Sequence, residues 1–188
     1  MKKVAIFASG SGTNAENIIR YFQNHSKIKI ALVVCNKATA GVLDVAARHN
    51  VPALLMEKEK FFRGDHYVPE LQQAGITFIV LAGFLWKVPQ GLIDVYRGQI
   101  INIHPALLPD YGGKGMYGDV VHQAVIDKKE KESGITIHYV DEHYDNGDII
   151  LQDRCQVAED DTAASLAEKI HALEYKNYPR VIEQLLSD

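Results

Sequence analysis

Residues 4–14 read Val-Ala-Ile-Phe-Ala-Ser-Gly-Ser-Gly-Thr-Asn, an apolar run that leads directly into a glycine-rich loop. The run at 4–8 predicts a short buried strand, and residues 14–24 have helical spacing with their apolar residues on one face. A strand that turns through glycines into a helix is the first half of a βαβ unit. This stretch therefore predicts an α/β fold.

The same alternation continues along the chain. Further strands are expected at 28–35, 53–56, 77–82 and 99–103, and helices between them at 41–49 and 59–74. Gly64 weakens the second of these helices and Gly75 ends it. Strands that alternate with helices pair in parallel, so we expect a Rossmann-like, open, mostly parallel twisted sheet with helices on both faces.

The second half of the chain departs from this rhythm. The glycine-rich segment 110–118 predicts a loop, and a helix is expected at 119–127. Two strands follow, at 135–140 and 149–157, joined by the polar loop 141–147. Neighbouring strands joined in this way predict an antiparallel addition to the parallel sheet.

The last segment, 162–186, has helical spacing. Asp161 and Thr162 are suitable caps for this helix, and Pro179 either kinks it or begins its last segment. The chain shows no repeat, linker or low-complexity segment. One domain is therefore predicted over residues 1–188.

Composition and charge limit the classes of function. The chain has 188 residues, a net charge of −4 and a sequence pI near 6.1, which argues against a broad nucleic-acid-binding face. Cys35 and Cys155 form no metal-binding pattern and indicate a reducing compartment. Met1-Lys2-Lys3 resembles the start of a signal peptide, but the apolar run after it is too short, and no stretch reaches membrane-spanning length. We expect a cytoplasmic protein without metal, nucleic-acid or membrane partners.

The loop Ser9-Gly10-Ser11-Gly12-Thr13-Asn14 is the first candidate site. Glycines allow a tight turn, and the helix N-terminus presents N–H groups to an anion, to which Thr13 and Asn14 add side-chain donors. The loop lacks the third glycine of a dinucleotide fingerprint and the Lys-Ser/Thr pair of a P-loop. It predicts a phosphate site; the alternative is a plain glycine turn with Thr13 as helix cap.

Residues 102–109, Asn-Ile-His-Pro-Ala-Leu-Leu-Pro, form the second candidate site. Asn102 and His104 alternate and so leave the strand by one face, and Pro105 ends the ladder after them. Ligands bind at the carboxyl ends of strands in open α/β sheets. An amide beside an imidazole suits a carbonyl that becomes an oxyanion. The alternative is a histidine that caps a strand end, with an asparagine that orders a turn.

Asp145 lies in the polar loop and is the third candidate. A solvated aspartate in an Asp-Asn-Gly turn is the common explanation for such a residue. His138, in the preceding strand, alternates with apolar neighbours and is expected to point into the structure beside that loop. An aspartate beside one or two histidines would orient them and relay protons. A buried structural histidine is the alternative for His138.

Four motifs occur in order along the chain: SGSGTN at 9–14, LAGF at 81–84, NIHPALLP at 102–109 and D-x-x-x-D-x-G at 141–147. Together with Glu174 ahead of a Tyr-Pro pair, this set resembles the folate-dependent formyltransferases over about residues 3–183, in particular the branch that acts on glycinamide ribonucleotide. The resemblance implies transfer of a formyl group from 10-formyltetrahydrofolate to the amine of 5′-phosphoribosylglycinamide.

The resemblance also implies roles for individual residues. Asn102, His104 and Asp145 would be catalytic: Asn102 and a protonated His104 would stabilise the oxyanion, and Asp145 would orient His104 and assist proton transfer. His138 would lie beside Asp145. The acceptor would be held by Gly12, Thr13, Asn14, Gly83, Pro105, His171 and Glu174. The folate would lie against Phe84, Leu85, Trp86, Val88, Val140, Asp141 and Glu142. The phosphate-binding half would be about residues 1–100, and the catalytic and folate-binding half about 101–188.

Three segments depart from the family pattern. Leu85-Trp86 stands where members carry Met-Arg, so an arginine contact to the folate tail is lost or is replaced by Lys87 or Arg63. His171 stands where some members have glutamine. The glycine-rich loop at 112–118 is also found in other branches, so the identity of the acceptor depends on the other motifs.

Three other functions fit parts of the sequence. One is a formyltransferase for another amine, either an aminoacyl-tRNA, which the acidic balance disfavours, or an amino sugar. A dinucleotide-dependent reductase is disfavoured by the incomplete glycine fingerprint. A non-catalytic binding module is disfavoured by the presence of Asn102, His104 and Asp145 together. The sequence allows either a monomer or a homodimer.

Overall fold

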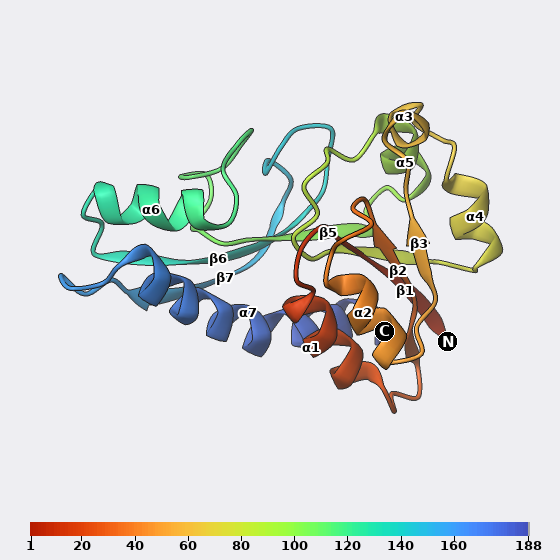
Figure 1. Ribbon diagram of the computed structural model, residues 1–188, viewed down its shortest axis with the longest axis horizontal. Helices are drawn as coiled ribbons and strands as arrows, with labels where there is room; N and C mark the ends of the chain where they lie inside the picture. The colour runs from red at the N-terminus through yellow and green to blue at the C-terminus, as the bar shows by residue number, and fades with distance from the viewer. Residues whose placement is uncertain (188) are drawn as a thin grey trace.

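Seven strands form one sheet through the centre of the protein (Figure 1). The computed structural model describes residues 1–187, and its strands lie in the order β3-β2-β1-β4-β5-β6-β7. They are β1 (Lys2–Ala8), β2 (Ile28–Cys35), β3 (Ala53–Leu55), β4 (Phe78–Leu81), β5 (Ile100–His104), β6 (Glu132–Tyr139) and β7 (Ile149–Gln156). β1 to β5 pair in parallel, whereas β6 and β7 pair antiparallel. This confirms the predicted mostly parallel sheet with its antiparallel addition.

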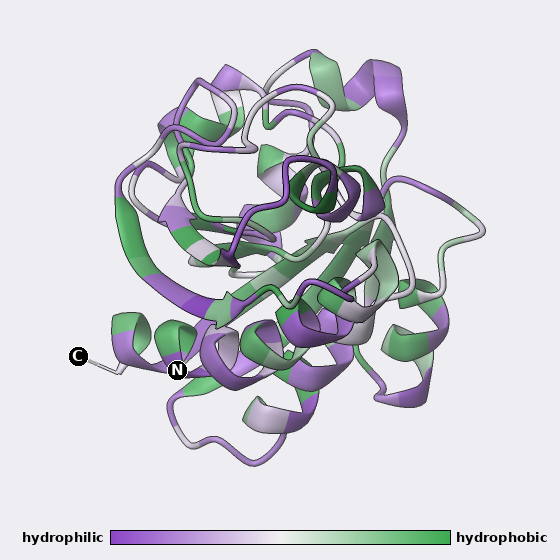
Figure 2. Cartoon of the chain, turned by 90° about the vertical axis from the view of Figure 1, so that its left-hand side faces the viewer, coloured by the Kyte–Doolittle hydropathy of each residue, from purple (hydrophilic) through white to green (hydrophobic). Residues whose placement is uncertain are grey.

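Helices cover both faces of the sheet, as predicted. They are α1 (Thr13–Phe22), α2 (Val42–Arg48), α3 (Lys58–Phe62), α4 (Val68–Gln73), α5 (Gln90–Val95), α6 (Asp119–Asp127) and α7 (Ala163–Leu186). α1, α2 and α7 lie on one face, and α3, α4 and α5 on the other (Figure 1). Alternate strand residues divide between two cores: Ile6 and Val80 pack with the first group of helices, Phe7 and Ile79 with the second. The central strands are largely hydrophobic, while the surrounding helices also carry hydrophilic stretches (Figure 2).

Two helical predictions need correction. The single helix expected at 59–74 is wrong, because α3 ends at Phe62 and α4 begins at Val68. Gly64 between them has a φ of 94°, a left-handed backbone conformation that an α-helix cannot include. α5 was not predicted, since a helix of six residues is too short to show helical periodicity.

The terminal helix begins as predicted. The Thr162 side chain accepts a hydrogen bond from the Ser165 backbone N–H, and the Ser165 hydroxyl accepts one from the Thr162 N–H, which forms a capping box. Asp161 adds a hydrogen bond from the Ser165 hydroxyl. α7 continues through Pro179, so this proline does not begin a separate segment. Within residues 1–187, no helix combines the length and the apolar character needed to cross a membrane.

The loops that carry the motifs meet at one edge of the sheet. β1, β4 and β5 are parallel neighbours, so their carboxyl ends lie side by side. The Ser9 N–H donates to the Gly83 carbonyl at 3.0 Å, and the Leu85 N–H donates to the Ser9 hydroxyl at 3.0 Å. These bonds tie the glycine-rich loop after β1 to the segment that follows β4.

Tyr178 of α7 forms hydrogen bonds to the strands near this edge of the sheet. This residue is fully buried, and its hydroxyl donates to the Leu81 carbonyl at 2.8 Å and lies 3.3 Å from the Ile101 carbonyl oxygen. Leu81 ends β4, and Ile101 lies in β5. The last helix therefore links the two strands on which the site is built.

Candidate active site

A cavity of about 630 Å³ lies at the carboxyl edge of the sheet. Its walls come from residues 10–14, residues 82–85, the end of β5, the glycine-rich segment 113–118 and α7. All seven residues expected to hold the acceptor line it: Gly12, Thr13, Asn14, Gly83, Pro105, His171 and Glu174. A cavity of this volume can enclose a ligand of the size of a nucleotide, since such sites span roughly 300–1,000 Å³.

The glycine-rich loop has the geometry of an anion site. Gly12 is the N-cap of α1 with a φ of 83°, and a Cβ there would lie 2.7 Å from the Val42 Cα, so only glycine fits. No side chain caps α1, and the alternative role of Thr13 as a helix cap is wrong. The N–H groups of the first turn are consequently not used by a capping side chain and remain suited to an anion.

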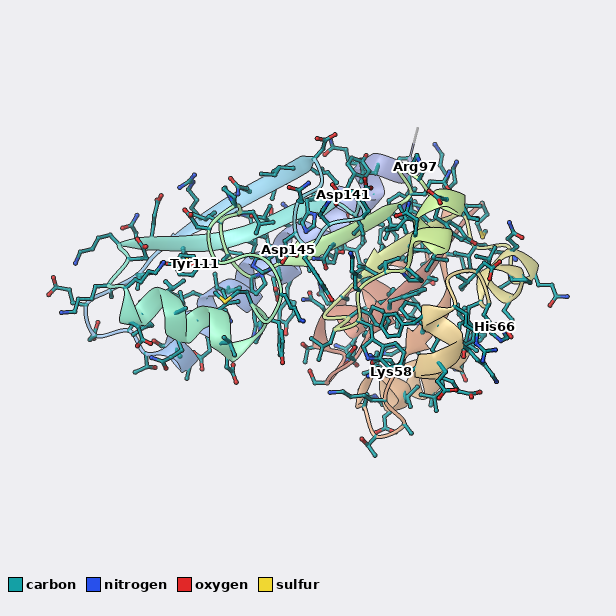
Figure 3. The ribbon with its side chains drawn as sticks, turned by 90° about the horizontal axis from the view of Figure 1, so that it is seen from above. Lys58, His66, Arg97, Tyr111, Asp141 and Asp145 are labelled. Carbon is teal, nitrogen blue, oxygen red and sulfur yellow. The ribbon has the colours of Figure 1, made fainter. Side chains whose placement is uncertain are left out.

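Asn102, His104, Asp145 and His138 come together beside this cavity. Asp145 Oδ2 lies 3.6 Å from His104 Nδ1, and Asp145 Oδ1 lies 3.7 Å from His138 Nε2. Asn102 Nδ2 lies 3.2 Å from His138 Nε2 and 3.5 Å from Asp145 Oδ1. The Asp145 side chain is 12% exposed and accepts a hydrogen bond from the Gly113 N–H at 2.9 Å, so it is not a solvated loop residue. It lies near the middle of the molecule, between the β6–β7 end and the parallel strands (Figure 3).

Backbone carbonyls determine which nitrogen of each histidine carries a proton. His104 Nε2 lies 2.7 Å from the Tyr111 carbonyl oxygen, which can only accept, so Nε2 is the donor and Nδ1 is left to face Asp145. His138 Nδ1 donates in the same way to the Tyr139 carbonyl at 2.8 Å. Its Nε2 is therefore an acceptor in the neutral ring.

Burial and neighbouring charges set the ionisation of the pair. Burial lowers the pKa of His104, and the Asp145 charge and the Tyr111 carbonyl oppose this shift without reversing it. Burial also opposes ionisation of Asp145, but its interactions with His138, His104 and the Gly113 N–H outweigh burial and lower the pKa of its carboxyl. The protein alone thus favours a neutral His104 beside an ionised Asp145 at neutral pH, and both ring nitrogens face acceptor oxygens that an imidazolium could also bind.

Glu174 places a second titratable group in the larger cavity. Asn14 Nδ2 donates to Glu174 Oε2 at 2.9 Å, which joins the first loop to the last helix. The Glu174 residue is only 7% exposed, and burial raises the pKa of its carboxyl to about 7, against the opposing hydrogen bond from Asn14. This carboxyl can act as a donor or as an acceptor near neutral pH.

A second cavity, of about 70 Å³, lies on the other side of Asn102 and Asp145. Five of the residues expected to hold the folate line it: Phe84, Trp86, Val88, Val140 and Asp141. Leu85 instead lines the larger cavity, and Glu142 lines neither of the two. Four residues line both cavities and so form the wall between them: Phe84, Asn102, Tyr144 and Asp145.

An aromatic cluster holds Trp86 at the smaller cavity. The Trp86 ring centre lies 5.4 Å from that of Phe61, 5.6 Å from that of Phe62 and 6.2 Å from that of Phe84. Phe61 and Phe62 belong to α3, and Phe61 is buried in the second core. Trp86 is therefore a fixed part of the cavity wall, supported by a helix distant in sequence.

Of the two cations considered as substitutes for the family arginine, Lys87 lines the smaller cavity and Arg63 lines neither cavity. The Lys87 ammonium lies 5.7 Å from the centre of the Tyr144 ring, within the range of a cation–π contact. This contact brings the segment after β4 and the loop between β6 and β7 together over the smaller cavity.

Several residues of the larger cavity were not predicted from the sequence. His122 of α6 lines it and is 2% exposed, and among residues 1–187 its Nδ1 has no hydrogen-bond partner. Burial lowers the pKa of His122, and the nearby His171 adds to this shift. Lys114 and Tyr117 come from the glycine-rich loop. His122 could have been found from the sequence by its place beside Val121 on the apolar face of the helix expected at 119–127. Within the described range no three His, Cys, Asp or Glu side chains are grouped so that they could hold a metal ion.

Comparisons with known sequences agree with this geometry. Residues 2–182 match the model of the formyl transferase family. The chain is 38% identical to phosphoribosylglycinamide formyltransferase of Bacillus subtilis over 191 residues, which cover 99% of this chain and 95% of that protein. It is also 38% identical to the chloroplastic phosphoribosylglycinamide formyltransferase of Arabidopsis thaliana over 187 residues, and it spans 64% of the length of that plant protein.

Solved structures of the same family share the fold. The chain superposes on the crystal structure of phosphoribosylglycinamide formyltransferase from Bacillus halodurans with a TM-score of 0.89 and 38% identity, covering 100% of this chain and 96% of that one. For glycinamide ribonucleotide transformylase 1 from Geobacillus kaustophilus the TM-score is 0.90 at 36% identity, with 99% of each chain covered. The chain therefore belongs to the formyl transferase family, among its phosphoribosylglycinamide formyltransferases.

Proposed function

We propose that this protein transfers the formyl group of 10-formyltetrahydrofolate to the amine of 5′-phosphoribosylglycinamide in purine biosynthesis. The products are formylglycinamide ribonucleotide and tetrahydrofolate. The observation that carries the proposal is the wall shared by the two cavities, in which Asn102 and Asp145 lie. Transfer between two substrates needs a reacting centre that both can reach, and this wall is where the two cavities adjoin.

The larger cavity suits a phosphorylated acceptor. The N–H groups of residues 12–14 would bind the phosphate at the N-terminus of α1. Glu174 would then bind a ribose hydroxyl, because its carboxyl faces the same cavity and has only the Asn14 side chain as a partner. This placement directs the amine of the acceptor toward Asn102 and His104, which line the same cavity.

The smaller cavity suits the flat heterocycle of the donor. Leu81, Phe84, Val88 and Val140 supply apolar walls, and Asn102 adds a polar side chain to the lining. Its volume of about 70 Å³ is below the roughly 300 Å³ of the smallest usual ligand sites. Donor binding therefore requires the cavity to widen, and because Trp86 is held by the aromatic cluster, the 141–147 loop is the part that would move.

Asn102 and Asp145 of the shared wall, with His104 beside them, can perform the transfer without a protein nucleophile. The amine of the acceptor attacks the formyl carbon, and its lone pair forms the new C–N bond while the carbonyl oxygen becomes an oxyanion. Asn102 donates a hydrogen bond to this oxygen. Neutral His104 accepts the amine proton on Nδ1, and the resulting imidazolium pairs with Asp145. The oxyanion then re-forms the carbonyl as the bond to the donor nitrogen breaks, and the His104 imidazolium returns its proton to that nitrogen, so no proton is consumed overall.

A spectrophotometric assay tests the reaction. The donor is supplied as 10-formyl-5,8-dideazafolate, and release of dideazafolate is followed with and without 5′-phosphoribosylglycinamide. We expect acceptor-dependent turnover that falls by roughly two to four orders of magnitude in His104→Ala. Turnover with an amino sugar but not with 5′-phosphoribosylglycinamide would refute the proposed acceptor. Turnover that survives in His104→Ala would refute the role of His104.

Trp86 provides a test of donor binding that does not depend on turnover. It is the only tryptophan in the sequence, and it lines the smaller cavity. We expect a saturable change in tryptophan fluorescence when the dideazafolate binds, and none of comparable size with 5′-phosphoribosylglycinamide alone. N-acetyltryptophanamide, titrated in parallel, corrects for light absorbed by the ligand. No saturable change would contradict the placement of the donor at this cavity.

The compartment and the assembly stay predictions. Cys35 is buried, Cys155 is half-buried, and both are free thiols, which supports a reducing compartment such as the cytoplasm. A monomer and a homodimer are distinguished by light scattering during gel filtration.

A further inference from the structure

A series of contacts leads from the protein surface to His104. The Tyr111 carbonyl accepts the hydrogen bond from His104 Nε2 at 2.7 Å. The Tyr111 hydroxyl donates to Glu130 Oε1 at 2.7 Å, and the Lys128 ammonium lies 4.7 Å from the centre of the Tyr111 ring. Glu130 and Lys128 line neither cavity, so they would touch no substrate. In Figure 3, Tyr111 lies on the α6 side of Asp145.

The side chain of Tyr111 holds its own backbone in an uncommon conformation. Tyr111 has a φ of 56°, in the left-handed region that residues with a side chain rarely adopt unless their surroundings hold them there. Its ring packs against the first core, in addition to its contacts with Glu130 and Lys128. Burial, together with the hydrogen bond to Glu130, raises the pKa of the phenol to about 12, so the hydroxyl is a permanent donor at neutral pH.

The same short segment also holds Asp145. The Gly113 N–H donates to Asp145 Oδ2 at 2.9 Å, and this oxygen is the one that lies 3.6 Å from His104 Nδ1. Residues 111–113 therefore bind both members of the His104–Asp145 pair through backbone atoms. Any shift of this segment changes the position of both at once.

We propose that Tyr111 is a positioning residue: anchored by Glu130 and Lys128, it presents its carbonyl to His104 Nε2 and leaves Nδ1 as the nitrogen that exchanges protons. This role rests on the proposed function. When the carbonyl is displaced, the neutral ring can move its proton to Nδ1, where Asp145 accepts a hydrogen bond. In that tautomer Nδ1 has no lone pair for the amine proton, and the reaction is slowed.

Kinetics of matched variants test the proposal. Tyr111→Phe removes the hydroxyl that binds Glu130 and keeps the ring. We expect kcat to fall about tenfold, equivalent to about 1.4 kcal/mol, with little change in KM for either substrate. Glu130→Ala should have the same effect, and Glu130→Gln, which keeps an acceptor oxygen, should restore activity. The double variant Tyr111→Phe with Glu130→Ala should be no slower than either single variant, because both remove one interaction.

Nitrogen NMR of the imidazole gives a readout that a merely structural role would not change. With 15N-labelled histidine and the His104 signals assigned from His104→Gln, we expect the Nε2-protonated tautomer in the parent protein and a mixture of tautomers in Tyr111→Phe. The pKa of His104 should fall further in Tyr111→Phe, since the Tyr111 carbonyl raises it. The other titratable groups around His104 are Asp145, His138 and His122, and the Tyr111→Phe substitution replaces none of them.

Glu159→Ala is the control. Glu159 is an exposed carboxylate, 3.5 Å from Lys131, without contact to Tyr111, and its removal should change neither kcat nor the tautomer. If Tyr111→Phe and Glu130→Ala keep the parent kcat and the parent tautomer, the proposal is wrong. The NMR measurement needs no substrate, so a failure of formyl transfer itself would be recognised separately.

Discussion

Replacement of Glu174 by glutamine should raise the free energy of unfolding at pH 8 and have a much smaller effect at pH 5. Burial raises the pKa of this carboxyl to about 7 in the folded protein, from 4.5 in the absence of burial. The folded state therefore binds more protons than the unfolded state between these values. The stability that this provides is fully present below pH 4.5 and is lost as the pH rises through 7.

The magnitude follows from the two pKa values. A carboxyl pKa that moves from 4.5 to about 7 on folding lowers the free energy of unfolding by about 3 kcal/mol at a pH well above 7. Most of this, about 2.5 kcal/mol, develops between pH 5 and pH 8. Glutamine keeps an oxygen for the Asn14 amide but has no charge to bury, so the variant should be more stable than the parent protein at pH 8 by an amount of this order.

Urea unfolding of the parent protein, Glu174→Gln and Glu168→Gln at several pH values between 5 and 8 provides the measurement. Glu168 is an exposed residue of the same helix and serves as the control. His104 and His122 have lowered pKa values, so the stability that their neutral forms provide is lost as the pH falls. This loss is common to all three proteins and cancels in the differences between their free energies of unfolding. If the difference between Glu174→Gln and the parent protein is independent of pH, like that of the control, the reasoning about Glu174 is refuted.

Three further substitutions test other parts of the structure. Gly12→Ala should destabilise the protein by at least about 1–2 kcal/mol and abolish acceptor binding, because alanine would have to adopt a left-handed φ and its Cβ would meet Val42. Normal acceptor binding in a titration calorimeter would contradict this. Tyr178→Phe should lower the free energy of unfolding by about 1–3 kcal/mol, since the buried Leu81 carbonyl loses its donor, and an unchanged denaturation curve would show that bond to be unimportant. Asp145→Asn should lower kcat with little change in donor affinity measured by tryptophan fluorescence, because it removes the charge beside the His104 imidazole. A variant that fails only to bind the donor would make Asp145 a binding residue instead.

Much of the site was predictable because simple periodic rules place its residues. Alternation along a strand puts Asn102 and His104 on one face, and the register of β5 against β6 brings His138 opposite Asn102. Parallel strands end at one edge, so the glycine-rich loop after β1 and the end of β5 lie at the same edge, with the end of β4 between them. The alternation of His138 in the preceding strand placed it beside the loop of Asp145, whereas the grouping of Asp145 with Asn102 and His104 came only from the resemblance to a family, since a loop has no periodicity.

The remaining features depend on contacts that have no local signal. The hydrogen bond from His104 to the Tyr111 carbonyl uses a backbone atom, which any residue type supplies. Support of Trp86 by α3 is a contact between segments far apart in sequence. Gly64 was recognised as a weak point of a helix, but whether a glycine weakens or ends a helix depends on its φ, which tertiary packing decides.

The hydrogen bond between Asn14 and Glu174 joins residues 160 positions apart, and it has a consequence for how the protein matures. The glycine-rich loop leaves the ribosome well before Glu174, His171 and Tyr178. The larger cavity is consequently complete only once α7 has docked beside that loop. A ligand that binds only the docked form stabilises it by mass action. The supply of the acceptor in the cell would thereby favour completion of folding and protect the last helix from proteases.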